Sequence, residues 1–106
     1  MKKIVCIILI YLTFCFLTPL PFANAQKGEE VFLTKCGTCH GKGGKAPNLS
    51  PVKFASTQWK RFFEKNKHAR RTDISDVVSV PEIIAVKVYL MEHAADSDLP
   101  IATGTR

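Results

Sequence analysis

Cysteine and histidine side chains gather in one short segment, Cys36-Gly37-Thr38-Cys39-His40. Two cysteines separated by two residues, with a histidine directly after the second, are the attachment pattern of a c-type haem. The spacing lets two thiols add to the two vinyl groups of one porphyrin while the adjacent imidazole reaches the iron. The alternatives are a redox-active cysteine pair and half of a zinc site. No βαβ pattern is visible and no cysteine follows Cys39, so the segment predicts one covalent haem c with His40 as the proximal iron ligand.

The first 25 residues have the composition of an export signal. A basic start precedes an almost unbroken apolar run over 4–17, and two prolines and the small-residue box Ala23-Asn24-Ala25 follow. The alternative is an uncleaved membrane anchor, because the apolar run approaches spanning length. The prolines and the cleavage box argue against an anchor. We therefore expect a cleavable signal peptide over 1–25 and an exported domain over 26–106, in the bacterial periplasm, with no membrane anchor left after cleavage.

The length and charge of the remaining chain limit what it can be. Cys6 and Cys15 leave with the signal, so Cys36 and Cys39 are the remaining cysteines and no disulfide is expected. A chain this short buries little apolar surface, and a covalent porphyrin gives its core a large apolar body to pack around. The formal net charge of +6 loses two units with the signal. This mild excess suits an acidic protein partner or an anionic surface better than nucleic acid, which is not an expected partner.

The pattern of apolar residues predicts an all-α domain with about three helices around one haem and no significant sheet. The first helix is expected over 28–35, directly before the haem motif. A loop over 41–49 is followed by a second helix over 56–66, which begins at one of two hydroxyl residues that could cap it. The third helix begins at a proline and covers 81–95. The segment 96–106 is predicted to be an irregular tail.

The chain resembles the small monohaem class I cytochromes c over essentially all of the exported part. Gly28 and Phe32 are four residues apart, and Phe32 lies four residues before the haem motif, as in the N-terminal helix of that family. Val86 and Tyr89, followed by Leu90, are similar to the apolar–aromatic pair of the family's C-terminal helix. The resemblance implies that these two helices cross closely, with the glycine giving room to the aromatic ring.

The resemblance also implies a loop contact and a function. Pro47-Asn48-Leu49 is similar to the family loop whose proline carbonyl accepts a hydrogen bond from the proximal histidine, here His40. The function implied is electron transfer, with single electrons passing between larger periplasmic or membrane redox partners. The residues form no acid–base pair or activated nucleophile, so no enzymatic activity is expected.

The distal side of the haem departs from the family pattern. The usual ligand is a methionine in the loop before the last helix, and residues 41–90 contain none. Met91 falls inside the last helix, where packing is the simpler interpretation, and His93 meets the same geometric objection. His68 is better placed to cover the distal face and is the preferred sixth ligand, followed by an open distal site and then Met91. Two imidazoles predict a lower potential than a His/Met pair, and an open or displaceable site predicts binding of NO or CO.

The predicted second helix carries three large aromatic side chains, Trp59, Phe62 and Phe63. The porphyrin is the obvious surface for them to cover. Trp59 could pack on the haem or donate its indole N–H to a propionate, and core packing is the safer interpretation.

Six cations and one acid lie close together over residues 60–71. The cations are Lys60, Arg61, Lys65, Lys67, Arg70 and Arg71. A solvated helix face is the simplest interpretation of such a run. The alternative is a docking surface for an acidic redox partner, because transient electron-transfer complexes use small interfaces with charge steering. Two further hypotheses for the chain are a gas-binding haem module and a haem subunit of a larger oxidoreductase.

Overall fold

The computed structural model describes residues 3–6 and 22–105. Its helices are α2 (Phe22–Val31), the π-helical turn η1 (Phe32–Cys36), α3 (Gly37–His40), the 3-10 turn η2 (Pro51–Lys53), α4 (Ser56–Glu64), the 3-10 turn η3 (His68–Arg70) and α5 (Val80–Glu92). No strand occurs in the described residues, which confirms the all-α prediction. No helix among them combines the length and the apolar character needed to cross a membrane. The predicted signal peptide lies largely outside the described residues, so it stays a prediction.

The first helical run is longer than predicted. Helical structure extends from Phe22 through α2, η1 and α3 to His40. It begins before residue 28 because the preceding residues include alanine, glutamine and lysine, which favour helix. Within the run the backbone widens by one residue at η1, where the Gly37 N–H donates to the carbonyl of Phe32. Such π-helical turns occur often at functional sites, and this one ends at Cys36.

The helix α4 ends two residues before the predicted position. Asn66 adopts a left-handed conformation with φ of 46°, which breaks the helical hydrogen-bond pattern. The prediction that Ser56 or Thr57 caps the helix is wrong. Ala55 occupies the capping position, and its N–H donates to the side-chain oxygen of Gln58 at 2.8 Å. Glutamine three residues after the cap can accept this bond without any hydroxyl at the cap itself.

The helix α5 begins one residue before the predicted proline and ends at Glu92. Ser79 and Glu82 form a reciprocal cap: the Ser79 hydroxyl accepts from the Glu82 N–H, and the Glu82 carboxylate accepts from the Ser79 N–H. Two N–H groups that lack helical partners are thereby satisfied. Pro81 occupies the first turn, as predicted, where its missing N–H costs nothing.

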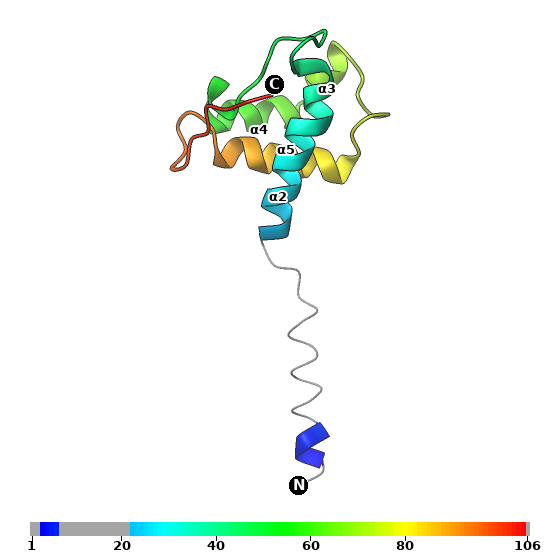
Figure 1. The fold of residues 1–106 in the computed structure, drawn as a ribbon, viewed down its shortest axis with the longest axis vertical. Coiled ribbons are helices and arrows are strands. Elements are labelled where there is room, and N and C mark those ends of the chain that lie inside the picture. Colours follow the sequence, from blue (N-terminus) through cyan, green and yellow to red (C-terminus); the bar gives the residue numbers. More distant parts are fainter. Residues whose placement is uncertain (1–2, 7–21, 106) are drawn as a thin grey trace.

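The core forms where the first helical run crosses α5 (Figure 1). Phe32 and Tyr89 pack with ring centroids 5.7 Å apart. A Cβ on Gly28 would lie 2.7 Å from the Cβ of Tyr89 and would overlap the carbonyl of Ala85. Only glycine allows this approach, as the resemblance implies. The buried apolar side chains are Val31, Phe32, Trp59, Val78, Val86, Tyr89, Leu90 and Ala94.

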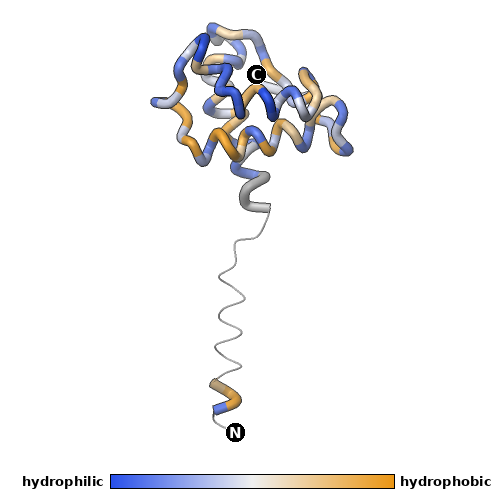
Figure 2. The backbone as a smooth tube through the Cα atoms, turned by 180° about the vertical axis from the view of Figure 1, so that it is seen from behind, coloured by the Kyte–Doolittle hydropathy of each residue, from blue (hydrophilic) through white to orange (hydrophobic). Residues whose placement is uncertain are grey.

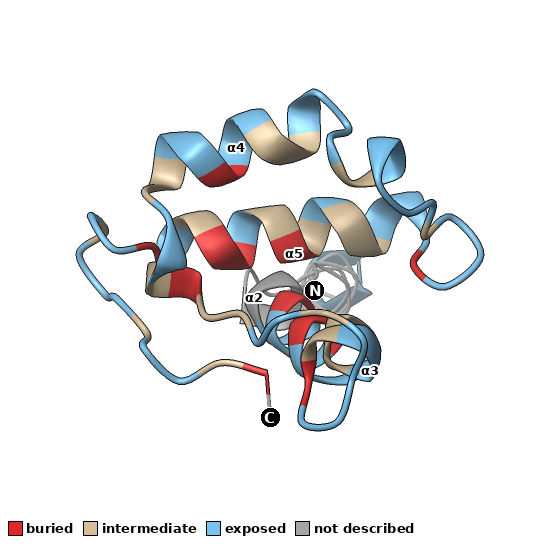
Figure 3. Cartoon of the chain, turned by 90° about the horizontal axis from the view of Figure 1, so that it is seen from above, coloured by how far each residue is buried: buried red, intermediate tan, exposed pale blue. Residues whose placement is uncertain are grey.

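The helix α4 lies alongside α5 and closes the core on a second side (Figure 3). Trp59 is the buried residue of α4 and packs edge-on against Phe54, with centroids 4.9 Å apart. Its ring also stacks on Phe63 at 6.3 Å. Aromatic pairs at these separations add directional stabilisation to the area they bury.

The C-terminal tail is irregular, as predicted, but it is held against the domain. The N–H of Ile101 donates to the carbonyl of His93 at 3.1 Å, and the N–H of Thr105 donates to the carbonyl of Leu49 at 2.9 Å. Thr105 is only 3% exposed. Figure 1 shows the tail returning across the top of the domain, so the end of the chain packs beside the loop that follows the haem motif.

Candidate functional site

The two cysteines of the motif lie one helical turn apart and differ in burial. Cys36 ends η1 and packs against the core, whereas Cys39 lies exposed in α3. Both thiols are free. Burial raises the pKa of the Cys36 thiol to about 11, because the thiolate loses solvation there. The motif therefore offers one thiol on the core side of the helix and one on its open side.

The histidine of the motif is held by the loop that follows it. The Nδ1–H of His40 donates to the carbonyl of Pro47 at 2.7 Å, which is the hydrogen bond that the resemblance implies. The loop closes with two backbone bonds, from Gly41 to the carbonyl of Gly37 at 2.8 Å and from Ala46 to that of Cys39 at 2.9 Å. The bond to Pro47 leaves Nε2 as the nitrogen available to a metal and fixes the orientation of the ring.

A second histidine lies close to the first. His68, in η3, is half-buried, and its imidazole centroid lies 6.3 Å from that of His40, with 78° between the ring planes. Its Nδ1–H donates to the carbonyl of Thr72 at 2.8 Å, so Nε2 is again the nitrogen left for a metal. Two imidazoles that share one metal, each with its nitrogen about 2 Å away, place their centroids roughly 6 Å apart. The observed separation would allow one metal ion to be held between the two rings.

A cavity of about 320 Å³ adjoins His68. It is lined by the end of α4, η3, the loop over 71–79 and the start of α5, and its apolar lining includes Phe62, Phe63, Ile74 and Val78. Two further lining residues, Val80 and Ile84, are 75% and 53% exposed. Cofactor pockets are typically apolar and of at least this volume. The cavity and the exposed apolar side chains at its edge thus form a largely apolar hollow beside His68, and none of Cys36, Cys39 and His40 lines it.

Comparison with known proteins gives a family. A family model described as "Cytochrome C oxidase, cbb3-type, subunit III" matches residues 23–90, more than half of the chain. The chain belongs to this family. No curated protein and no solved structure matches the chain. Membership makes the chain a c-type cytochrome, implies covalently bound haem c and supports a role in haem-based electron transfer.

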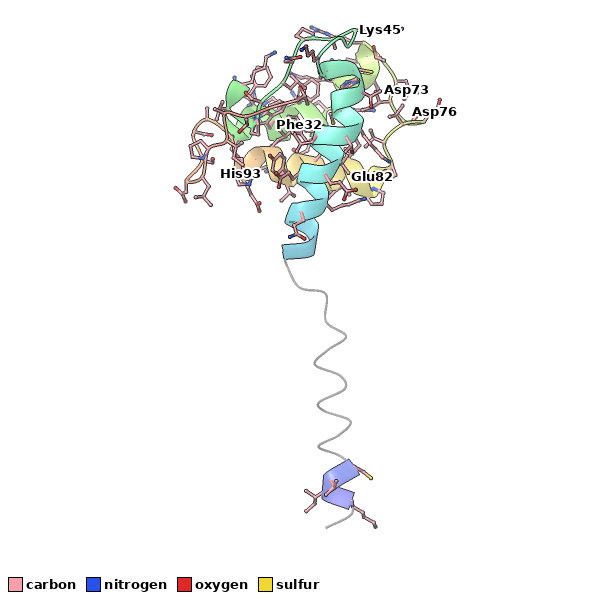
Figure 4. The ribbon with its side chains drawn as sticks, viewed as in Figure 1. Phe32, Lys45, Asp73, Asp76, Glu82 and His93 are labelled. Atoms are coloured by element: carbon pink, nitrogen blue, oxygen red, sulfur yellow. The ribbon has the colours of Figure 1, made fainter. Side chains whose placement is uncertain are left out.

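Two other possible ligands of this cytochrome are engaged elsewhere. Met91 is half-buried on α5 and packs against the core, in accord with the packing interpretation. His93 donates its Nδ1–H to the carbonyl of Leu99 at 2.7 Å and packs against Tyr89 with centroids 5.0 Å apart. Figure 4 shows Glu82 near the start of α5 and His93 at the other end of the helix. The structure therefore brings His68, and neither of these residues, to His40.

The suggestion that Trp59 donates to a haem propionate is wrong in this structure. Its indole N–H donates to the carbonyl of Pro51 at 2.8 Å, inside the protein. The ring is 3% exposed and lies between Phe54 and Phe63. A buried indole N–H needs a partner, and η2 supplies it. Trp59 is thus a core residue of the cytochrome.

The six cations over residues 60–71 are all exposed, and none of them takes part in an ion pair within the described residues. They lie on α4, in the turn after it and in and directly after η3, so they precede and follow His68 in the sequence. Hydrophilic and hydrophobic residues alternate along the helices of the domain (Figure 2). A positive surface thus borders the half-buried histidine.

Three contacts of the site were missed by the sequence analysis. Lys35, next to Cys36, pairs with Glu82 at 2.7 Å, which joins the haem-motif helix to the cap of α5. The bond to Lys35 and the bonds from Ser79 lower the pKa of Glu82 to about 2. The spacing of Ser79 and Glu82 is a readable signal for the cap but not for the ion pair. The bonds of Thr72 and Thr105 have no local sequence signal, because both residues lie in irregular segments.

Proposed function

We propose that the chain is an exported monohaem cytochrome that carries single electrons between larger redox partners. Cys36 and Cys39 would hold the porphyrin through thioethers, and His40 would bind the iron through Nε2. When bound, haem supplies the Fe(III)/Fe(II) couple, which exchanges one electron without group transfer. The family match and the Cys-x-x-Cys-His motif support this assignment.

His68 is proposed as the sixth ligand, and its distance from His40 is the single observation that carries the proposal. The centroid separation of 6.3 Å suits a metal between the rings, and both Nδ1 atoms are already bonded to carbonyls. Each backbone carbonyl engages Nδ1 and fixes the orientation of its ring, so Nε2 is the nitrogen left to bind iron in both histidines. Two neutral imidazoles favour ferric iron relative to a His/Met pair, so the carrier should have a low potential.

The exposed cations beside His68 are proposed to dock an acidic redox partner. Their charge would steer the partner toward the histidine side of the domain and raise the association rate. Rapid release is equally necessary for a shuttle, and a small charged interface provides it. No other class of partner, nucleic acid included, is favoured by the site.

A haem subunit of a larger oxidoreductase is the second candidate, because the family description names an oxidase subunit. The two candidates differ in assembly. A shuttle elutes as a monomer at low ionic strength, whereas a subunit co-purifies with its partners. The predicted signal peptide favours export in either case, since c-type cytochrome domains are typically exported or membrane-associated.

The test is the optical spectrum of the reduced protein, produced in cells that attach c-type haem, before and after addition of CO. The proposal predicts a low-spin spectrum that CO does not change, because His68 occupies the sixth position. A prompt change with CO would show an open or displaceable site and would favour a gas-binding module instead. Absence of covalent haem would overturn the proposal as a whole.

A further inference from the structure

The side chain of Thr105 connects the end of the chain to the backbone of the haem motif. Its hydroxyl donates to the carbonyl of His40 at 2.6 Å and accepts from the N–H of Leu49 at 2.9 Å. The N–H of Thr105 donates to the carbonyl of Leu49 at 2.9 Å. A single buried residue thus makes three hydrogen bonds of 2.9 Å or shorter to two residues that are 65 and 56 positions away in the sequence.

The two residues that Thr105 bonds lie at the two ends of the loop that orients the His40 ring. His40 begins this loop, and Leu49 follows Pro47, whose carbonyl accepts from His40 Nδ1. The approach of the tail is close: a Cβ on Gly104 would overlap the carbonyl of Leu49. The closeness of Gly104 and the burial of Thr105 show that the tail is fitted to this loop.

We propose that Thr105 is a positioning residue for the proximal haem ligand: its hydroxyl ties the His40 carbonyl to Leu49 and so holds the Pro47 carbonyl against His40 Nδ1. This inference rests on the proposed function, in which His40 binds the iron. The effect passes through the backbone and requires no contact between Thr105 and haem.

Removal of the hydroxyl has a defined electronic consequence. The His40 carbonyl and the Leu49 N–H would lose a buried partner, and unsatisfied buried groups drive local rearrangement. The loop would then relax and the bond from His40 to Pro47 would weaken. When the hydrogen bond from His40 Nδ1–H to the Pro47 carbonyl weakens, the imidazole gives less electron density to its metal. Ferric iron is then less stabilised, and the reduction potential rises.

The test compares four haem-loaded proteins: wild type, Thr105→Val, Thr105→Ser and the tail control Thr103→Val. Valine keeps the shape of threonine without the hydroxyl, serine keeps the hydroxyl, and Thr103 is exposed in the same tail. The ferrous-to-ferric ratio at a fixed applied potential should rise about three- to tenfold in Thr105→Val, a tenfold rise being a shift of about 59 mV for one electron. The serine and control proteins should match the wild type.

The outcomes separate the positioning role from simple stabilisation. If Thr105→Val unfolds more readily but keeps the wild-type potential, Thr105 only stabilises the fold and the inference is wrong. An equal shift in Thr105→Ser or Thr103→Val would also overturn it. Should the valine variant fail to accumulate, Thr105→Ala removes the same hydroxyl with a smaller side chain. Failure of the proposed function is seen separately, as absence of covalent low-spin haem in the wild type.

Discussion

The imidazole rings of His40 and His68 lie 6.3 Å apart although 27 residues separate them in the sequence. One ring extends from the haem-motif helix and the other from a short 3-10 turn after α4. The Nδ1–H of His40 donates to the carbonyl of Pro47, and the Nδ1–H of His68 donates to the carbonyl of Thr72. The fold thus brings two imidazoles together, and a cavity with a largely apolar lining adjoins one of them, His68. The separation of the rings is the one that the proposed function needs for two imidazoles bound to one iron.

Replacement of His68 should open the distal side. In His68→Ala the reduced protein should bind CO and its midpoint potential should rise, because the second imidazole is lost. The matched control is His93→Ala, which removes a histidine of similar burial that bonds Leu99 instead. Optical CO titration checks both variants. A His68→Ala protein that remains closed to CO would show that another residue is the sixth ligand.

Substitution of Gly28 should destabilise the helix crossing. In Gly28→Ala the added Cβ meets the carbonyl of Ala85 and the Cβ of Tyr89, and overpacking of this kind costs about 1–3 kcal/mol. Gly37→Ala is the control, because a Cβ there meets nothing closer than 4.0 Å. Denaturant unfolding of the haem-loaded proteins measures the difference. Equal stability of the two alanine variants would contradict the close crossing.

The ion pair of Lys35 and Glu82 should make stability depend on acid pH. The pKa of Glu82 is lowered from 4.5 to about 2 in the folded protein, so its ionised form stabilises the fold. That stabilisation is complete above pH 4.5 and is lost as the pH falls toward 2. We expect wild type to exceed Glu82→Gln in unfolding midpoint at pH 7, with the difference shrinking below pH 4.5. A difference that does not change with pH would show that the carboxylate charge contributes nothing.

Charge reversal beside His68 should slow electron exchange with an anionic surface. A carboxylate-coated electrode serves as the acidic partner, and voltammetry gives the exchange rate. Lys67→Glu should lower that rate several-fold at low salt, whereas Lys27→Glu, on the first turns of α2, should change it little. The two variants should converge near 1 M salt, where charge interactions reach only about 3 Å. Equal effects of the two variants at low salt would argue against a local docking surface.

Much of the architecture could be predicted because its signals are local. The motif over 36–40, the apolar spacing of the last helix and Pro81 each indicate their own structure from a few neighbouring residues. The close approach of Gly28 to Tyr89 was implied by the resemblance to cytochromes c, and the structure confirms it.

The parts that could not be predicted depend on contacts between distant residues. The hydrogen bond from the Trp59 indole to the Pro51 carbonyl could not be predicted from periodicity. An aromatic helix face of this kind can cover either a porphyrin or a protein core. The docking of Thr105 depends on a loop more than fifty residues earlier, and its threonine looks like any other in an irregular tail. The π-helical turn before Cys36 likewise has no composition that distinguishes it from α-helix.

The most direct measurement is a crystal structure of the haem-loaded protein, read at the two axial positions of the iron. The proposed function predicts His40 Nε2 on one side and His68 Nε2 on the other, each about 2 Å from the iron, as is usual for imidazole bound to a metal. It also predicts that Nδ1 of each ring remains bonded to Pro47 and Thr72. A sixth position occupied by Met91 or water, with His68 turned to solvent, would contradict it.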